Sequence, residues 1–256
     1  MSEALLSVRH LNKAFAGVRA VQDFSLDVRP GEVVGLIGPN GAGKSTIINL
    51  VSGFHQADSG AVVFRGRPIL GKSPDSIARL GMVRTFQHIR LFPSLTVREN
   101  VEAAAQSRST VSLVDALLRT PRYRHAMADM QRKADALLRL FQVADVDAQL
   151  AGTLPYGHQR RIEIVRALAT QPALLLLDEP AAGMNDVEAA ALADFLARVA
   201  SSQGLAVVLV EHHLDVVMRL CRRVVVLDHG ATLAVGTPEE VTRHPDVVRA
   251  YLGEVA

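Results

Sequence analysis

A glycine-rich segment near the amino terminus has the residue types needed to hold phosphate groups. It reads Gly38-Pro-Asn-Gly-Ala-Gly-Lys44-Ser45 and matches the pattern G-x-x-x-x-G-K-[S/T] in full. Glycines let the backbone adopt positive φ, so that successive N–H groups approach phosphate oxygens, and a following helix points its positive end at the same anion. The Lys44 ammonium can reach the terminal phosphates of ATP, and the Ser45 hydroxyl can bind Mg²⁺.

The position of this segment argues against a chance glycine-rich turn. It lies between a short apolar strand expected over Glu32–Ile37 and a helix expected from Lys44 onward, which is the context that the motif requires. The sequence therefore predicts a site for ATP and Mg²⁺. Its nucleotide-binding residues are Gly38, Pro39, Asn40, Gly41, Ala42, Gly43, Lys44, Ser45 and Thr46.

Two acidic residues follow a second apolar stretch, in Leu174-Leu-Leu-Leu-Asp178-Glu179-Pro180. In open α/β sheets, ligands bind at the carboxyl ends of the strands. Asp178 is suited to hold Mg²⁺ through water, and Glu179 is suited to polarise the water that attacks the γ-phosphate. An ordinary strand that ends in solvent would look the same, and it is the phosphate loop that favours the catalytic interpretation.

The elements around these residues alternate between strands and helices, which predicts an α/β fold with a largely parallel sheet covered on both faces. The expected strands are Leu5–Leu11, Val18–Val21, Phe24–Val28, Glu32–Ile37, Val62–Arg65, Pro68–Leu70, Ala173–Leu177, Leu205–Val210 and Arg223–Leu227. A helix is expected over Asp186–Val199, and Thr237-Pro-Glu-Glu240 has the pattern of a capped helix start.

The middle of the chain, from about 90 to 165, is predicted to be a helical subdomain inserted into this core. Thr96-x-x-Glu99 is a capping-box pattern, and Pro121 suits the first turn of another helix. An apolar stripe with helical spacing follows, which favours packing over a ligand site. It consists of Met127, Met130, Ala134, Leu137, Leu138 and Phe141.

Composition narrows the class of protein. The chain has 256 residues, of which 49% are apolar, yet no apolar run approaches the ~18 residues of a membrane span. The start lacks the pattern of a signal peptide, and a single cysteine, Cys221, excludes an internal disulfide. A net charge of +2 gives little general attraction to nucleic acid. These properties favour a soluble cytosolic protein.

Three further segments, taken in order with the two nucleotide motifs, point to a family. They are Arg84-Thr-Phe-Gln87, Leu154-Pro-Tyr-Gly-His-Gln-Arg-Arg161 and Glu211-His212. In order and spacing the chain resembles the nucleotide-binding subunits of ABC transporters over essentially its whole length. The resemblance implies a P-loop NTPase core over 1–89 and 166–256, with an N-terminal antiparallel β-subdomain and an inserted helical subdomain, in a single ABC ATPase domain.

The resemblance also implies residue roles. Phe15 would stack on adenine, Gln87 would sense Mg²⁺ and the attacking water, and His212 would bind the γ-phosphate. Without the other motifs, Phe15 would be interpreted as a core aromatic and His212 as a solvated histidine. The implied catalytic residues are Glu179, His212, Gln87 and Lys44; the magnesium residues are Ser45, Gln87 and Asp178; the signature residues, which act on the partner's ATP, are Leu154, Tyr156, Gly157 and His158.

Two positions depart from the family pattern. The usual signature is Leu-Ser-Gly-Gly-Gln, but Pro155 has neither a hydroxyl nor an N–H, and Asn185 stands where the loop that crosses to the partner usually has aspartate. The Tyr-Gly signature is ordinary in LivG-type ATPases, which energise import of branched-chain and related amino acids. Residues 84–92, 155–164, 178–185 and 246–254 also resemble that subgroup.

The implied function is ATP hydrolysis for an amino-acid importer, by a head-to-tail homodimer or heterodimer with a second ABC ATPase. The implied partners are two transmembrane permease subunits and, indirectly, an extracytoplasmic solute-binding protein, at the cytoplasmic face of the membrane. One alternative, a soluble ABC ATPase acting on nucleic acid, is disfavoured by the single cassette and small net charge. Another, a catalytically weak cassette, is motivated by Pro155 and Asn185.

Two smaller expectations complete the interpretation. The stretch His88–Phe92 is apolar and basic, and it is interpreted either as a docking groove for a membrane-subunit helix or as part of the buried interior of the helical subdomain. His212 and His213 are expected to diverge as neighbours at a strand end, and no zinc site is predicted.

Overall fold

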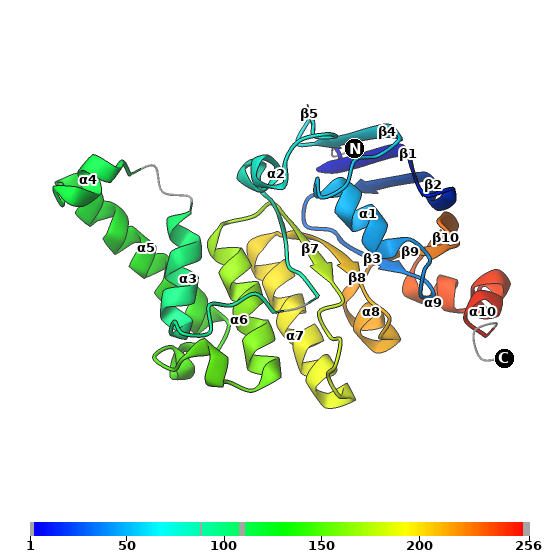
Figure 1. Cartoon of the computed structure of the whole chain (residues 1–256). Coiled ribbons are helices and arrows are strands. Elements are labelled where there is room, and N and C mark those ends of the chain that lie inside the picture. The colour runs from blue at the N-terminus through cyan, green and yellow to red at the C-terminus, as the bar shows by residue number, and fades with distance from the viewer. Residues whose placement is uncertain (1–2, 88, 108–110, 253–256) are drawn as a thin grey trace. The chain divides into compact units, whose positions relative to one another are not determined.

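The computed structural model describes residues 3–87, 89–107 and 111–252 (Figure 1). The chain divides into two compact units. One, the core unit, comprises Met1–Gln87 and Ala173–Ala256, and the other, the helical unit, comprises His88–Pro172. The sequence placed the helical part at about 90–165, so in the structure this unit also includes all of the helix that follows the signature segment.

The core unit contains a six-stranded sheet with the order β10-β9-β3-β8-β7-β6. Its strands are β3 (Val33–Ile37), β6 (Met82–Arg84), β7 (Leu174–Asp178), β8 (Ala206–Val210), β9 (Arg223–Asp228) and β10 (Ala231–Gly236). All neighbours pair in parallel except β9 and β10. Every residue of β3, β7 and β8 is buried, as expected for apolar strands covered on both faces. The predicted, mostly parallel α/β core is confirmed.

A second sheet, antiparallel, is formed by β1 (Leu6–Phe15), β2 (Val18–Val28), β4 (Ser59–Phe64) and β5 (Arg67–Pro68), in the order β2-β1-β4-β5. The two strands expected over 18–21 and 24–28 are a single strand, β2. Its register against β1 shifts, and Asp23 takes φ 50°, which is an irregularity that a sequence pattern interprets as a break.

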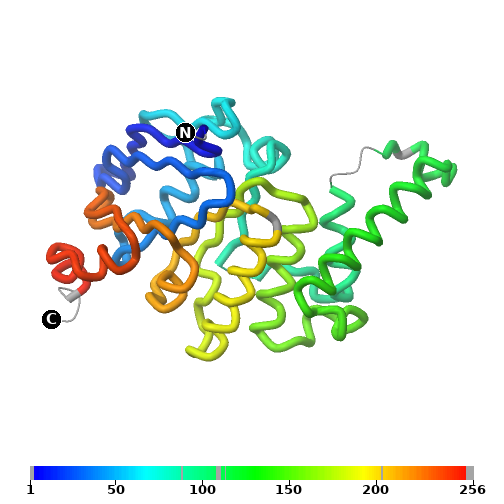
Figure 2. The backbone as a smooth tube through the Cα atoms, turned by 180° about the vertical axis from the view of Figure 1, so that it is seen from behind, coloured from blue at the N-terminus to red at the C-terminus, as the bar shows by residue number. Residues whose placement is uncertain are grey.

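The described residues of the core unit also form helices that pack around these sheets. These helices are α1 (Lys44–Val51), α2 (Pro74–Leu80), α7 (Asp186–Gln203), α8 (Leu214–Leu220), α9 (Pro238–Thr242) and α10 (Pro245–Leu252). The predicted apolar face of α7 is buried, including Leu192, Phe195 and Val199. At the carboxyl-terminal end, α9 and α10 lie beside β10, which both backbone views show (Figures 1 and 2).

The helical unit is built from α3 (Val97–Gln106), α4 (Leu113–Leu117), α5 (Pro121–Leu140) and α6 (Tyr156–Ala169), with short 3₁₀ turns at Ala144–Val146 and Ala151–Thr153. The predicted capping box at Thr96 and the predicted helix start at Pro121 are both present. Four residues of the apolar stripe are buried, which confirms its packing role: Met130, Ala134, Leu138 and Phe141.

Ion pairs on one arginine connect α3 to the rest of the helical unit. The guanidinium of Arg98 donates to Asp135 on α5 and to Asp147 in the following loop. These two carboxylates raise the pKa of Arg98 above its ordinary value.

No helix in the described part of the chain has the length and hydrophobicity to span a membrane.

Candidate nucleotide-binding site

The glycine-rich segment forms the turn between β3 and α1, as its motif requires. Gly38 has φ 150° and Gly43 has φ 98°. A Cβ on Gly38 would lie 2.2 Å from the carbonyl oxygen of Leu227, and a Cβ on Gly43 would lie 2.3 Å from that of Ala20. Only glycine fits these two positions, because neighbouring backbone occupies the space of a side chain. The loop therefore keeps its concave backbone at the start of α1.

Lys44 extends into the concavity of this loop. Its side chain is almost fully buried, and its Nζ donates hydrogen bonds to the carbonyl oxygens of Gly38 (2.6 Å) and Pro39 (2.8 Å). Ser45 is exposed in the first turn of α1, next to Thr46. A buried ammonium and the positive end of a helix thus converge on one hollow, which is the arrangement that favours binding of phosphate.

The acidic pair lies where the sequence placed it, at the carboxyl end of β7. Asp178 is the last residue of the strand and is 5% exposed. Glu179 follows with φ 47°, a conformation uncommon outside glycine, and its N–H donates to the carbonyl oxygen of Val210 at 2.9 Å. Gln87 Nε2 donates to Glu179 Oε2 at 2.9 Å. The structure therefore brings together two residues, Gln87 and Glu179, that are 92 positions apart in the chain.

Arg84 is a residue of this site to which sequence reasoning assigned no role. Its Nη2 donates to Asp178 Oδ2 at 2.7 Å, and the two side chains are 9% and 7% exposed. Its Nη1 donates to Asn49 Oδ1 at 2.6 Å and to Ser52 Oγ at 3.3 Å. The motif Arg84-Thr-Phe-Gln87 contained the residue, but no spacing rule connects an arginine on β6 with a carboxylate on β7.

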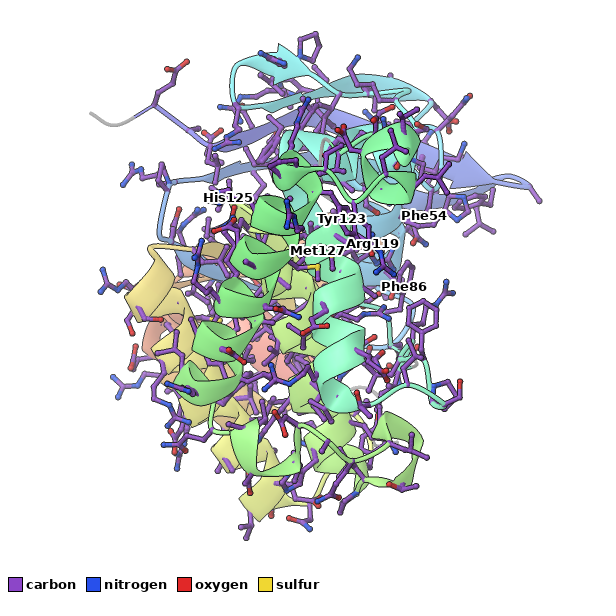
Figure 3. The ribbon with its side chains drawn as sticks, turned by 90° about the vertical axis from the view of Figure 1, so that its left-hand side faces the viewer. Phe54, Phe86, Arg119, Tyr123, His125 and Met127 are labelled. Carbon is purple, nitrogen blue, oxygen red and sulfur yellow. The ribbon has the colours of Figure 1, made fainter. Side chains whose placement is uncertain are left out.

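Two aromatic rings enclose the guanidinium of Arg84. Its Cζ lies 5.5 Å from the centroid of Phe54 and 5.2 Å from that of Phe86. The two rings are themselves edge to face, with centroids 5.5 Å apart, and both are labelled in Figure 3. Stacking on aromatic faces holds an arginine in one orientation, so the charge beside Asp178 is a fixed one.

Glu211 is a second residue near this site to which the sequence analysis assigned no role. It is fully buried after β8, where Oε1 accepts the N–H of Ala181 at 2.8 Å. Its Oε2 accepts the N–H groups of His212 at 3.0 Å and His213 at 3.2 Å. This carboxylate therefore joins the loop after β7 to the loop after β8. The pair Glu211-His212 was visible in the sequence, but burial of the glutamate follows only from the fold.

The expectation that His212 and His213 diverge is wrong. Their ring centroids lie 4.4 Å apart with the planes tilted by 40°. The chain has left β8 at this point and bends around Glu211, so the alternation of side chains along a strand no longer applies. The His212 side chain is 49% exposed. Its predicted contact with the γ-phosphate stays a prediction.

Phe15 ends β1 and is 42% exposed, so the alternative interpretation as a core aromatic is wrong. Its ring meets that of His55 edge to face, with centroids 5.5 Å apart, and Lys13 Nζ lies 5.2 Å from its centroid. An exposed aromatic face is available for stacking. The adenine contact itself stays a prediction.

The signature segment lies in the helical unit, at the start of α6. Leu154 is buried, Tyr156 is 43% exposed, and Pro155 is the N-cap residue, with no side-chain hydrogen bond to the helix. The carbonyl oxygen of Pro155 accepts the N–H of His158 at 3.0 Å, so α6 begins directly after the proline, and Gly157 lies in its first turn. The signature segment thus still forms the amino terminus of a helix, where the helix dipole favours negative charge, although the serine of the family pattern is absent.

Asn185 also has a structural explanation. It is the N-cap of α7, where its Oδ1 accepts the N–H of Glu188 at 3.0 Å and its own N–H donates to Glu188 Oε2 at 3.2 Å. Asparagine and aspartate cap helices about equally well. Asparagine therefore caps α7 here in the way that the usual aspartate would.

The residues predicted to hold Mg²⁺ fit that ion chemically. Ser45, Gln87 and Asp178 offer a hydroxyl, an amide oxygen and a carboxylate, which are hard oxygen donors. Mg²⁺ is usually bound by one or two carboxylates together with substrate phosphates. The described residues contain no cluster of three or more His, Cys, Asp or Glu able to hold a metal. The donor set therefore fits an ion bound jointly with phosphate.

Comparison with known proteins identifies the class. The family model described as "ABC transporter" matches residues 21–182, which is more than half of the chain. This chain belongs to the ABC transporter family of ATP-binding cassettes, as the sequence resemblance predicted. A second family model, described as "Branched-chain amino acid ATP-binding cassette transporter", matches residues 231–256.

Relatives of known function match nearly the whole chain. It is 42% identical over 254 residues to the high-affinity branched-chain amino acid transport ATP-binding protein LivG of Salmonella typhimurium, covering 99% of this chain and 100% of the relative. It is 41% identical, with the same coverage, to the corresponding protein BraF of Pseudomonas aeruginosa. The predicted resemblance to LivG-type ATPases is confirmed.

Solved structures agree with the family and the fold. The ADP conformation of MJ1267, an ATP-binding cassette of an ABC transporter, superposes with a TM-score of 0.84 at 30% identity, covering 98% of this chain and 100% of that chain. A nucleotide-free cassette from an ABC transporter superposes with a TM-score of 0.81 at 30% identity, covering 97% and 99%.

Proposed function

We propose that this chain is the ATP-hydrolysing subunit of an ABC importer for branched-chain or related amino acids. One observation carries the chemistry: in the core unit a buried Lys44 lies in a glycine-lined phosphate loop, and Gln87 is hydrogen-bonded to Glu179. The amino-acid class rests on the names of the relatives, LivG and BraF, which match along nearly the full chain.

Each residue of the core unit has a role in this proposal. The loop N–H groups and Lys44 bind and orient the phosphates of ATP, and Phe15 stacks on the adenine. Ser45, Asp178 and Gln87 would hold Mg²⁺, which would neutralise part of the phosphate charge. Glu179 accepts the proton of the attacking water, Gln87 positions that water, and His212 donates a hydrogen bond to the γ-phosphate.

The site is completed by a second subunit. In the proposed head-to-tail dimer, the amino terminus of α6 and Gly157 face the ATP held by the partner, and Leu154, Tyr156 and His158 shape that segment. The partner is a second copy or a homologous ATPase. The assembly includes two membrane permease subunits and, indirectly, an extracytoplasmic solute-binding protein, and it lies at the cytoplasmic face of the membrane. The whole chain is then a single ABC ATPase domain.

The segment after Gln87 is the proposed docking surface for a permease helix. His88 lies outside the described residues, whereas Phe92 is 52% exposed. Its backbone is held by Asn100, which donates from Nδ2 to the Phe92 carbonyl at 3.0 Å and accepts the Phe92 N–H at 2.9 Å. Glutamate at Ile89 and Phe92 should abolish co-purification with the permeases. Retained co-purification, with ATP turnover intact, would show that docking occurs elsewhere.

The function is tested by reconstitution. The chain is combined with its permeases in proteoliposomes with ATP inside and solute-binding protein outside, and uptake of labelled leucine is compared with that of labelled histidine and glucose. We expect ATP-dependent uptake of leucine that is lost in Lys44→Ala. ATP turnover coupled to a different solute would refute the amino-acid assignment but retain the transporter. Absence of ATP turnover in the complex would refute both.

A further inference from the structure

The short helix α4 presents an apolar face to solvent. Val114, Leu117 and Leu118 are 64%, 84% and 69% exposed, and their spacing of three and four residues places them on one side of the helix. Large apolar side chains that gather on one exposed face mark an interaction surface, whereas scattered ones do not. These three side chains are not buried in the core of the helical unit.

Positive charge follows this apolar face along the chain. Arg119, Arg122 and Arg124 follow it directly and are exposed, and Figure 3 labels Arg119 beside α4 and α5. None of the three forms an ion pair with another described residue. Residues 111–127 contain these three arginines against one acidic residue, Asp115. The local balance is therefore strongly basic in a chain whose net charge is only +2.

The one acidic residue of this segment is engaged inside it. Asp115 accepts hydrogen bonds from the hydroxyls of Ser112 (2.7 Å) and Thr120 (2.9 Å), which lower the pKa of its carboxyl below the ordinary value. These bonds cap the start of α4 and connect its end to α5. The charge of Arg122 lowers the pKa of Asp115 further, so this single carboxylate offsets only part of the charge of the three arginines.

The space on the inner side of α4 is open. A pocket of about 600 Å³ lies between α3, α4, α5 and the end of α6, and its lining includes Ala116, Tyr123, Met127, Met130 and also Arg122. Figure 3 shows Tyr123 and Met127 on α5, the longest helix of this unit. Since α4 borders an open pocket, its outer face can be substituted without disturbing a tightly packed interior.

We propose that this surface, formed by Val114, Leu117, Leu118, Arg119, Arg122 and Arg124, binds a membrane surface rich in anionic lipid headgroups. An apolar face flanked by arginines is the pattern of elements that lie in the interface of a bilayer, with the apolar side chains inserted and the cations at headgroup level. The proposed function, in which the chain belongs to a membrane-bound complex, is the reason to expect a membrane near this surface. Lipid binding and ATP turnover are separate measurements.

The test uses the full purified chain and sedimentation with vesicles. We expect binding to vesicles of phosphatidylethanolamine with phosphatidylglycerol, much weaker binding to neutral phosphatidylcholine vesicles, and loss of binding at high salt. Alanine at Arg119, Arg122 and Arg124 should reduce affinity roughly fivefold per residue, or on the order of 100-fold together. Serine at Leu117 and Leu118 should reduce it by about tenfold or more, because two apolar side chains no longer insert.

Control variants remove the same number of charges, and one exposed apolar side chain, from the core unit. They are alanine at Arg29, Arg67 and Arg222, and serine at Val187, all exposed. These controls should bind vesicles like the wild type, and every variant should keep wild-type ATP turnover. If the wild-type chain showed no ATP turnover, the proposed function would be refuted, but the measurement of vesicle binding would still test the lipid proposal.

Three results would overturn the lipid proposal. The first is wild-type binding that does not distinguish anionic from neutral vesicles. The second is unchanged binding after the arginine or leucine substitutions. The third is an effect of those substitutions on self-association, or on co-purification with the permeases in detergent, without an effect on vesicle binding. That outcome would assign the surface to a second copy of the chain or to a membrane protein.

Discussion

The ion pair between Arg84 and Asp178 predicts a large loss of stability when the arginine is replaced. In Arg84→Met, Asp178 keeps its buried position and loses the guanidinium that lies 2.7 Å away, while Asn49 loses its partner at 2.6 Å. Removing one member of a buried pair typically reduces the free energy of unfolding by about 3–5 kcal/mol, because the remaining charge stays desolvated. For a chain of this size the melting temperature should fall by roughly 6–20 °C.

The assay is thermal unfolding followed by circular dichroism, with two comparisons. Arg79→Met removes an ion pair of the same core unit, with Asp75, in which both side chains are more than 70% exposed, so it should have little effect. The double variant Arg84→Met with Asp178→Asn should be more stable than Arg84→Met alone, since no uncompensated charge remains. The reasoning is refuted if Arg84→Met melts within a degree or two of Arg79→Met, or if the double variant is less stable than the single one.

Three further predictions follow from single positions. Glu179→Gln should bind ATP normally and reduce turnover by about 10²–10⁴, the scale for loss of a general base; unchanged turnover would remove Glu179 from the mechanism. Gly43→Ala should weaken ATP binding roughly tenfold to hundredfold, because its Cβ would lie 2.3 Å from the Ala20 carbonyl, whereas Gly71→Ala, with similar φ but open space, should not. Cys221 should resist thiol reagents at about pH 8 until the chain unfolds, since burial, and secondarily the charge of Glu211, raise its pKa to about 12.

The raised pKa of Cys221 also has a consequence for stability. A thiol whose pKa is higher in the folded chain favours folding while it is neutral. That contribution is complete below about pH 9 and is lost as the pH rises from there toward about 12. Wild type should therefore lose stability above pH 9 more steeply than Cys221→Ala, as denaturation midpoints would measure. Equal slopes would contradict the assignment.

Local sequence was sufficient for the elements whose signals are local. The phosphate loop, the capping boxes at Thr96 and Thr237 and the helix start at Pro121 all lie where predicted, and β7 ends one residue later than predicted, at Asp178. In each case the signal is a property of adjacent residues, such as positive φ, a missing N–H or a side chain that caps its own helix. The irregular strand β2 was divided in two, since a register shift depends on its partner strand.

Local sequence patterns could not predict the contacts that organise the site. Gln87 and Glu179 are adjacent only because β6 pairs with β7, and Arg84 meets Asp178 across the same pair of strands. Glu211 gains the N–H of Ala181 as a donor only where the loops after β7 and β8 come together. Strand pairing sets these neighbours, and pairing between distant segments leaves no local pattern.

The sequence by itself therefore determined the chemistry: phosphate-binding loop, acidic pair and family. Only the tertiary structure decided how that chemistry is supported. It placed Lys44 inside the loop, fixed a cation beside Asp178, and left the apolar face of α4 in solvent. The physical reason is that a motif specifies which groups are present, whereas burial, charge pairing and exposure depend on which distant segments the fold brings into contact.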